Sequence, residues 1–176
     1  MKNIEVEVRS FISEEKYKEL IEFFKKEGKF VKEDYQETYY LDCKEDLRIY
    51  RTNSNSIVLL KKGKVHDYFR EEIEIKFKRE DFEELEKLFS NLGFNVSAKW
   101  FRKRFEFKWH EINVCLDYTK GYGYIIELEK MSDENEKEET LKELKEKMKI
   151  LSISITPKEE FDKKFLHYKE NWRNLN

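Results

Sequence analysis

The chain has 176 residues, of which 42% are charged, and 36 Lys and Arg against 38 Asp and Glu leave a formal net charge of −2. Hydrophobic residues still make up 39% of the chain and aromatic residues 15%. This composition excludes intrinsic disorder, which combines low hydrophobicity with a large net charge. A net charge near zero also gives no global attraction to nucleic acid or to an anionic membrane.

A cytoplasmic protein without a membrane partner is expected from the remaining composition. No apolar run approaches the ~18–20 residues of a membrane span, and the first residues lack the apolar segment of a secretory signal. Cys43 and Cys115 lie far apart and form no CxxC pair, which argues against a disulfide scaffold or a thiolate zinc site.

The first third of the chain predicts one helix among strands. Residues 4–9 alternate between apolar and charged residues, as a half-buried strand does. A helix follows, with Ser13 as its N-cap and Gly28 at its end. Two short strands are expected between residues 35 and 51.

Further strands and a second helix are expected in the middle of the chain. The strands are predicted over residues 57–61, 68–77, 99–109, 112–118 and 124–129, with a turn at 62–64 between the first two. The helix covers residues 79–92 and ends at Gly93.

Two helices are predicted at the C-terminal end, within residues 133–173. The first opens at Ser132 and Asp133, and the second opens at a capping box from Thr156 to Glu159 with Pro157 at its first position. Helical spacing points four aromatic side chains of the last helix inward: Phe161, Phe165, Tyr168 and Trp172. We therefore expect one α+β domain over residues 1–176, with about eight mostly antiparallel strands and four helices.

Charged residues occupy alternate positions of at least five predicted strands, opposite an apolar face. A sheet with one face in water also shows this alternation. These faces, however, carry mainly carboxylates and cations rather than Thr, Ser and Gln, and glutamate pairs dominate the first and last strands. The charged faces are Glu5, Glu7 and Arg9; Arg70, Glu72, Glu74 and Lys76; Arg102, Arg104, Glu106 and Lys108; Asp117; and Glu127 and Glu129.

Closed into a barrel of about eight strands, such faces would line a polar lumen that can hold a ligand. Two carboxylates at ~4 Å repel by roughly 4 kcal/mol at an effective dielectric of 20, so the clustered glutamates predict a bound cation. Oxygen ligands without nearby His suit Mg²⁺ or Mn²⁺. Arginine matches phosphate oxygens bidentately, so a metal with a polyphosphate would satisfy both kinds of charge.

Six motifs occur in a fixed order: Glu5-x-Glu7-x-Arg9, Leu47-Arg48-Ile49, Lys61, Arg70-x-Glu72-x-Glu74, Arg102-x-Arg104, and Asp117-x-x-x-Gly121-x-Gly123-x-x-x-Glu127-x-Glu129. This order resembles the CYTH superfamily, the triphosphate tunnel metalloenzymes, which includes class IV adenylyl cyclases, thiamine triphosphatases and tripolyphosphatases. The resemblance runs from Ile4 to Glu129. It implies an eight-stranded antiparallel tunnel that binds a triphosphate with divalent metals, Mg²⁺ or Mn²⁺.

The resemblance also implies roles for single residues. Metal ligands would be Glu5, Glu127 and Glu129 for one ion, and Glu7, Asp117 and either Glu72 or Glu74 for a second. Phosphate would be bound by Arg9, Arg48, Lys61, Arg70, Arg102 and Arg104. The residues expected to act in catalysis are Glu5, Glu7 and Arg9.

Two positions depart from the family pattern. Arg9 stands where the family usually has Lys, which favours phosphate binding over proton transfer at this position, because arginine does not readily lose its proton. Tyr50 stands where a second arginine often follows Arg48, and the neighbouring Arg51 should face the other way in a regular strand.

The leading hypothesis for function is hydrolysis of inorganic tripolyphosphate or a nucleoside triphosphate. A class IV-type adenylyl cyclase, which makes cyclic AMP and pyrophosphate, is the nearest alternative. A third is a non-catalytic module that binds polyphosphate or a triphosphorylated RNA end. The expected partner is ATP, thiamine triphosphate, tripolyphosphate or a similar small molecule, and the protein is expected to be a monomer or a homodimer.

Overall fold

The computed structural model describes residues 4–63 and 66–175, which fold into eight strands and four α-helices. Residues 1–3, 64, 65 and 176, and with them the end of the predicted turn at 62–64, lie outside this part. The elements are β1 (Ile4–Ile12), α1 (Glu14–Glu27), β2 (Lys29–Leu41), β3 (Asp46–Arg51), β4 (Asn55–Lys61), β5 (Phe69–Lys78), α2 (Phe82–Asn91), β6 (Val96–Trp109), β7 (Ile112–Thr119), β8 (Gly123–Ser132), α3 (Lys137–Ile150) and α4 (Lys158–Leu175).

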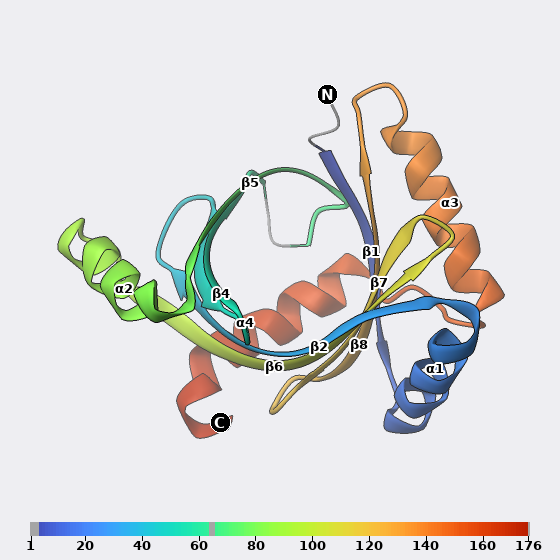
Figure 1. The fold of residues 1–176 in the computed structure, drawn as a ribbon, viewed down its shortest axis with the longest axis horizontal. Coiled ribbons are helices and arrows are strands. Elements are labelled where there is room, and N and C mark those ends of the chain that lie inside the picture. The colour runs from blue at the N-terminus through green and yellow to red at the C-terminus, as the bar shows by residue number, and fades with distance from the viewer. Residues whose placement is uncertain (1–3, 64–65, 176) are drawn as a thin grey trace.

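The strands close into an antiparallel barrel in the order β1-β5-β4-β3-β2-β6-β7-β8. Figure 1 shows this ring with α1 and α3 beside one another and α2 on the opposite side. The predicted α+β fold, an eight-stranded antiparallel barrel with flanking helices, is confirmed.

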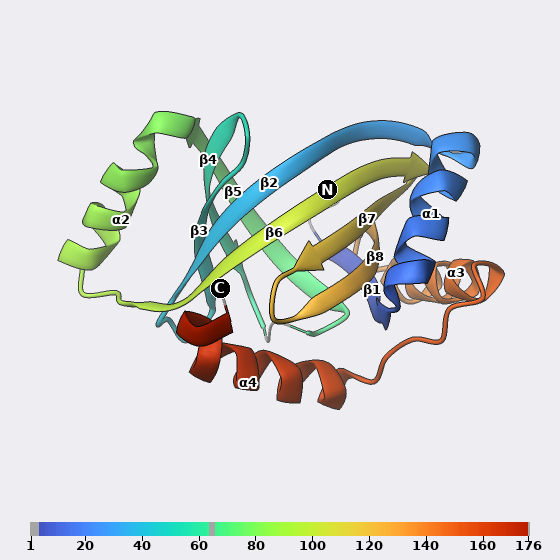
Figure 2. The ribbon, with the colours of Figure 1, turned by 90° about the horizontal axis from the view of Figure 1, so that it is seen from below.

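The helix α4 crosses one end of the barrel, as Figure 2 shows from below. Phe161 and Phe165 of α4 line the lumen at this end, and the hydroxyl of Tyr168 donates a hydrogen bond of 3.0 Å to the carbonyl of Lys99 on β6. The aromatic side chains of α4 thus face the barrel, as predicted.

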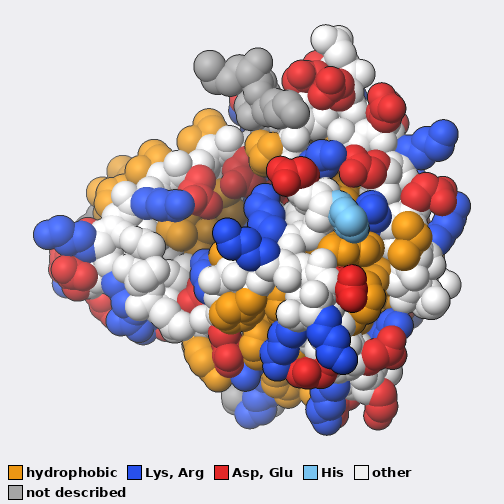
Figure 3. Space-filling view, turned by 45° about the vertical axis from the view of Figure 1, so that its right-hand side comes forward, with side chains coloured by type: hydrophobic (Ala, Val, Ile, Leu, Met, Phe, Trp, Pro, Cys, Tyr) orange, Lys and Arg blue, Asp and Glu red, His pale blue; other side chains and the backbone are white. Residues whose placement is uncertain are grey.

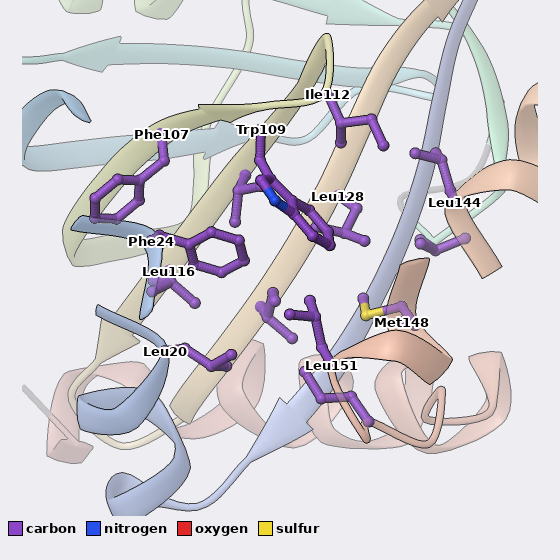
Figure 4. Close-up of a cluster of buried hydrophobic side chains, with 14 of the residues drawn as sticks. Leu20, Phe24, Phe107, Trp109, Ile112, Leu116, Leu128, Leu144, Met148 and Leu151 are labelled. Carbon is purple, nitrogen blue, oxygen red and sulfur yellow. The ribbon is translucent and has the colours of Figure 1, made fainter. Parts of the chain in front are cut away.

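The main apolar core lies outside the barrel, between its wall and the helices α1 and α3. Figure 4 shows its centre, where Phe24 of α1 and Met148 of α3 meet Trp109 of β6 and Leu128 of β8. Val6 and Val8 of β1 are fully buried in the same core. Because the apolar faces of these strands turn outward to the helices, their charged faces turn inward to the lumen.

The starts of β2 and α3 differ most from the predictions. β2 begins at Lys29, directly after α1, because it pairs with β6 along almost its whole length although its first residues show no clear apolar alternation. α3 begins at Lys137 rather than near Asp133, because the Asp133 carboxylate accepts hydrogen bonds from the backbone of Asn135 and Glu136 and holds a turn there.

The predicted capping box of α4 is wrong, although a helix follows as expected. The hydroxyl of Thr156 accepts a 3.0 Å hydrogen bond from the backbone N–H of Phe11 and lies 2.9 Å from the hydroxyl of Ser10. Thr156 therefore anchors the start of α4 to β1. The N-cap prediction at Ser13 is confirmed, since its hydroxyl accepts from the N–H of Lys16.

Candidate active site in the barrel lumen

The lumen is a charged cavity of about 450 Å³. Every residue that the sequence predicted for metal, phosphate or catalysis lines it: Glu5, Glu7, Arg9, Arg48, Lys61, Arg70, Glu72, Glu74, Arg102, Arg104, Asp117, Glu127 and Glu129. Strand alternation puts these residues on the inner faces of seven strands, and closure of the barrel brings them to one space.

Three glutamates, Glu5, Glu7 and Glu129, form a close carboxylate group, called the glutamate trio below. Their ligand oxygens lie within 4.8 Å of one another. Glu7 and Glu129 are opposite each other in the β1–β8 ladder, and Glu5 is the next inward residue of β1. Burial raises the pKa of Glu5, as do the carboxylates of Glu7 and Glu72, although Lys61 opposes the shift.

Glu7 and Glu129 respond differently to the same burial. Burial alone would raise the pKa of Glu7, but the guanidinium groups of Arg9 and Arg70 bring it below its ordinary value. Burial raises the pKa of Glu129 well above its usual range, and Glu5 and Glu127 raise it further. Among the described residues, no cation lies within ion-pair distance of the Glu129 carboxylate.

A hard divalent cation fits the glutamate trio. An octahedral Mg²⁺ holds oxygens at 2.0–2.1 Å, which places them up to about 4.2 Å apart, so small side-chain movements would bring the three carboxylates into such a shell. The unpaired charge of Glu129 gives the ion a reason to bind there. The residues present are therefore compatible with the Mg²⁺ or Mn²⁺ that the sequence predicts.

A second group joins Glu129 to Glu127 and to the thiol of Cys115, again with ligand atoms within 4.8 Å. Glu127 contacts Arg104 closely and lies 3.9 Å from Arg9, and these cations lower its pKa despite its burial. Burial raises the pKa of the Cys115 thiol, which favours its neutral form. The predicted ligands Glu5, Glu127 and Glu129 are thus split between two groups that share Glu129.

The other predicted metal ligands lie against cations instead. Asp117 accepts two hydrogen bonds from Arg104, at 2.7 and 2.6 Å, and one of 3.0 Å from Arg102. Glu72 lies 3.1 Å from Lys61, and Glu74 lies 3.4 Å from Lys76. Within residues 4–63 and 66–175, no group of three close ligands includes Asp117, Glu72 or Glu74.

Asp46 is a buried carboxylate behind two lumen arginines, Arg48 and Arg70, and the sequence reasoning missed it. Its carboxylate accepts two hydrogen bonds from Arg48 and one of 2.9 Å from Arg70, and Arg70 also donates to Glu7 at 3.0 Å. Burial would raise the pKa of Asp46, but Arg48 and Arg70 lower it below its ordinary value of 3.8. Its position two residues before Arg48, in phase on one strand, was the available signal.

The structure places Tyr50, which departs from the family pattern, and the neighbouring Arg51 on opposite faces of β3. The hydroxyl of Tyr50 faces the lumen and donates a 3.3 Å hydrogen bond to Glu74. Arg51 points outward as predicted, where it contacts Glu37 of β2 and Glu83 of α2. The lumen therefore has a neutral donor at position 50 in place of a cation.

Under α4 the lumen ends in an aromatic wall. Trp100, Tyr122 and Phe161 line it, and the guanidinium carbon of Arg9 lies 5.8 Å from the ring centre of Phe161. His66 lies beside them, 2.5 Å from Asp162 of α4, and burial together with Arg9 lowers its pKa to about 4. Helical spacing predicted that Phe161 points inward, but not that it meets Trp100, Tyr122 and His66, because these residues come from distant segments.

An eight-stranded antiparallel barrel with a charged lumen places the chain in the class of tunnel-fold proteins. The model of the CYTH domain matches residues 3–166, and the chain belongs to this family. None of the described helices is long and apolar enough to cross a membrane.

Three relatives illustrate the similarity. A Methanocaldococcus jannaschii protein, named as a candidate adenylate cyclase, is 34% identical over 161 residues, which are 86% of this chain and 91% of the relative. The structure of protein PH1012 from Pyrococcus horikoshii has a TM-score of 0.74 at 24% identity and covers 88% of this chain and 95% of its own. A Hippeastrum protein, named as a candidate adenylyl cyclase and described as having a dominant triphosphatase activity, has a TM-score of 0.62 at 19% identity, over 86% of this chain and 89% of its own.

Proposed function

We propose that this protein is a divalent-metal-dependent enzyme that hydrolyses inorganic tripolyphosphate or a nucleoside triphosphate. The observation that carries the proposal is that the glutamate trio and six cations line one cavity: Arg9, Arg48, Lys61, Arg70, Arg102 and Arg104. A triphosphate with one hard cation has the matching charges, because its oxygens suit the cations and its metal suits the carboxylates.

The glutamate trio would hold Mg²⁺ or Mn²⁺, and Glu127 lies within 4.8 Å of one of its members, Glu129. When bound, the metal would neutralise charge on the phosphate oxygens and could lower the pKa of a bound water. A second ion at Glu7, Asp117 and Glu72 or Glu74 has less support, because Asp117 is already held by two arginines.

The cations of the lumen are paired with its carboxylates, and this pairing prepares them for phosphate. Arg102 and Arg104 share Asp117, while Arg48 and Arg70 share Asp46. A guanidinium group has five donors, so each of these arginines keeps donors for phosphate oxygens while a carboxylate fixes its orientation. The arginines would spread the negative charge that develops when water attacks the terminal phosphorus and the bridging P–O bond breaks.

Arg9 belongs to phosphate binding in this proposal rather than to proton transfer. Burial would lower the pKa of its guanidinium, but the carboxylates of Glu7 and Glu127 raise it above its ordinary value. A group that stays protonated can bind phosphate but cannot act as a base. The base for the attacking water would then be a carboxylate of the glutamate trio, two of whose members, Glu5 and Glu7, the resemblance implies to be catalytic.

An adenylyl cyclase is the second candidate, and the relative that shares 34% identity with this chain favours it. In that reaction the ribose 3′-hydroxyl attacks the α-phosphorus, cyclic AMP forms and pyrophosphate leaves. The same metal and arginines would serve it, so the difference rests on which oxygen is placed in line with phosphorus.

Product analysis tests these proposals directly. The protein is incubated with ATP or with tripolyphosphate, each with Mg²⁺ or Mn²⁺, and the products are separated by anion-exchange chromatography. Orthophosphate release supports the hydrolase, whereas cyclic AMP with pyrophosphate replaces it by the cyclase. Tight binding without turnover would reject both enzymes in favour of a binding module, and neither binding nor turnover would reject the tunnel site.

A further inference from the structure

Two of the lumen arginines lie against aromatic rings. The guanidinium carbon of Arg48 lies 4.6 Å from the ring centre of Tyr40, which is its partner in the β2–β3 ladder. The guanidinium carbon of Arg9 lies 5.8 Å from the ring centre of Phe161 on α4. Both distances are within the range of about 6 Å over which a cation is attracted to the face of an aromatic ring.

Both rings are part of the aromatic packing under α4. Phe161 stacks on Phe11 of β1, with ring centres 4.3 Å apart and an angle of 20° between the ring planes. Tyr40 meets Phe165 of α4 edge to face, with ring centres 5.2 Å apart. The helix α4, which crosses this end of the barrel in Figure 2, thus supplies one of the two rings and supports the other.

The arginines are more accessible than the aromatic wall behind them. Trp100, Tyr122 and Phe161 are only 6%, 3% and 2% exposed, so little of their ring surface is open to a ligand. The side chains of Arg9 and Arg48 line the lumen and are 15% and 12% exposed. At this end of the lumen the aromatic wall therefore suits the support of arginines better than the binding of a ligand ring.

The contact with a ring holds an arginine in a way that a metal ion would not disturb. Arg9 also contacts the carboxylate of Glu7, and Arg48 contacts that of Asp46. Glu7 belongs to the glutamate trio, so a metal ion bound there would compete with Arg9 for the same oxygens. The ring of Phe161 has no oxygen to offer a metal ion, and its contact with Arg9 would remain.

We propose that Phe161 and Tyr40 are positioning residues, whose rings keep Arg9 and Arg48 in place to bind a phosphate group in the lumen. This inference rests on the proposed function in one respect, because it takes the two arginines as phosphate ligands. A guanidinium group that lies over a ring can still donate hydrogen bonds from its edge, since its five donors lie in its plane. An arginine held in this way loses less side-chain entropy when phosphate binds.

The same contacts couple the ligand to α4. If the packing of α4 holds Arg9 in place, a ligand that holds Arg9 must in turn favour the packing of α4, because coupling between two equilibria is reciprocal. Binding of a triphosphate should therefore make local opening of α4 less frequent.

The affinity for tripolyphosphate with Mg²⁺ tests the positioning role. Tyr40→Leu and Phe161→Leu should each weaken it roughly 3- to 30-fold, with a smaller change in kcat, because each variant loses one cation–π contact. Tyr40→Phe and Phe161→Tyr keep the ring and should stay close to the wild-type protein. The affinity is taken from KM in the phosphate-release assay, or from calorimetric titration if the protein binds tripolyphosphate without hydrolysing it. Equal affinities of the leucine and the aromatic variants would overturn the inference.

Phe24→Leu is the matched control. Phe24 is fully buried in the main core outside the barrel, so this change also removes a buried ring but leaves the lumen untouched. The melting temperature should fall, as it does for Phe161→Leu, while the affinity for tripolyphosphate stays unchanged. An equal loss of affinity in both variants would trace the effect to lost stability and refute the positioning role.

The wild-type protein separates this inference from the proposed function. If it neither binds nor hydrolyses tripolyphosphate with Mg²⁺ or Mn²⁺, the proposed function and the inference both fail. If it binds tripolyphosphate and both leucine variants bind equally well, only the inference fails. Circular dichroism checks that each variant is folded, and the two positions test the same idea independently.

Hydrogen exchange tests the coupling to α4. Saturating tripolyphosphate with Mg²⁺ should slow exchange of the α4 backbone amides several-fold in the wild-type protein, and less in Phe161→Leu. The helix α2, which packs outside the barrel through Phe82 and Leu85 (Figure 1), is the internal reference and should change much less. Equal protection of α2 and α4, or no protection of α4, would contradict the coupling.

Discussion

Glu129 is a lumen residue whose charge the described part of the protein compensates poorly. Burial and the neighbouring carboxylates of Glu5 and Glu127 raise its pKa, and no described cation contacts it. A carboxyl group whose pKa is raised on folding binds more protons in the native state, so its ionisation lowers stability as pH rises through that pKa. A bound metal ion would compensate the charge of the ionised Glu129 and so remove this loss of stability.

Glu129→Gln should raise the stability of the metal-free protein but lower its activity. Without metal, the variant is expected to melt about 2–4 °C higher at neutral pH, the shift that ~1 kcal/mol produces in a domain of this size, because a neutral amide replaces a poorly compensated carboxylate. Its phosphate release should fall roughly 100-fold or more, since a metal ligand is lost. Scanning calorimetry and the product assay measure the two effects.

Glu71→Gln is the control for this substitution. Glu71 lies on β5, points away from the lumen and forms a 2.9 Å ion pair with Lys62, with 43% of its side chain exposed. This change should leave both the melting temperature and the activity nearly unaltered. A Glu129→Gln protein with full metal-dependent activity would contradict the metal role of Glu129.

Asp46→Asn tests whether Asp46 supports phosphate binding by holding Arg48 and Arg70 in place. Loss of the carboxylate leaves Arg48 and Arg70 with weaker partners, and breaking such buried pairs typically costs about 3–5 kcal/mol. The Michaelis constant for the triphosphate should rise about tenfold or more, with a smaller change in kcat, because both arginines would lose their fixed orientation. Steady-state kinetics with chemical denaturation would show both effects.

The pH dependence of this variant provides a second readout. The pKa of Asp46 is lowered on folding, so its contribution to stability is present above its ordinary value of 3.8 and is lost as pH falls. The stability difference between the wild-type protein and Asp46→Asn should therefore shrink below that pH. A difference that stays constant into acid would contradict the assigned ion pairs.

At the scale of elements, β1 joins the lumen to the helix that covers it. Its charged face supplies Glu5, Glu7 and Arg9 to the cavity. Near its end, the backbone N–H of Phe11 donates a hydrogen bond to Thr156, just before α4. The alternation of residues 4–9 was enough to predict the strand and its two faces. The contact with Thr156 was not predictable, because it joins residues 145 positions apart.

Thr156→Val should loosen the start of α4. The backbone N–H of Phe11 would lose its acceptor, and an unsatisfied buried donor costs about 1–3 kcal/mol. We expect a melting temperature roughly 2–10 °C lower. Thr156→Ser keeps the hydroxyl and should remain close to the wild-type protein; if serine and valine had equal effects, the hydrogen bond would not be the cause.

The strand β2 illustrates the limit of local patterns. Its first residues, from Lys29 to Asp34, alternate too weakly to indicate a strand, yet they pair with β6 from Lys108 to Arg104. The long β6 ladder, rather than the intrinsic preference of these residues, sets their conformation. For this reason the sequence predicted only the second half of β2.

At the scale of the whole molecule, the barrel has its apolar faces outside and its charges within. Figure 3 shows that acidic and basic side chains also mix over an outer face, which accounts for part of the 42% charge without any functional role. The remaining charges line the lumen, where opposite signs lie within ion-pair distance of one another.

Ligand binding should therefore stabilise the whole barrel. Tripolyphosphate with Mg²⁺ or Mn²⁺ at about 100 times the dissociation constant should add ~2.7 kcal/mol, which is a melting shift of about 5–10 °C. Either component alone should give a smaller shift, because one sign of lumen charge stays uncompensated. No shift with saturating metal and tripolyphosphate, measured by differential scanning fluorimetry, would contradict a triphosphate site in the lumen.

The sequence by itself determined which strand faces carry charge, since side chains alternate with a fixed period of two, and the order of six motifs was enough to indicate the family. It could not determine which charges meet, because ion pairs between strands depend on register and closure. The tertiary structure decided that Glu129 joins Glu5 and Glu7, that Asp117 and Asp46 each hold two arginines, and that α4 ends the lumen in an aromatic wall.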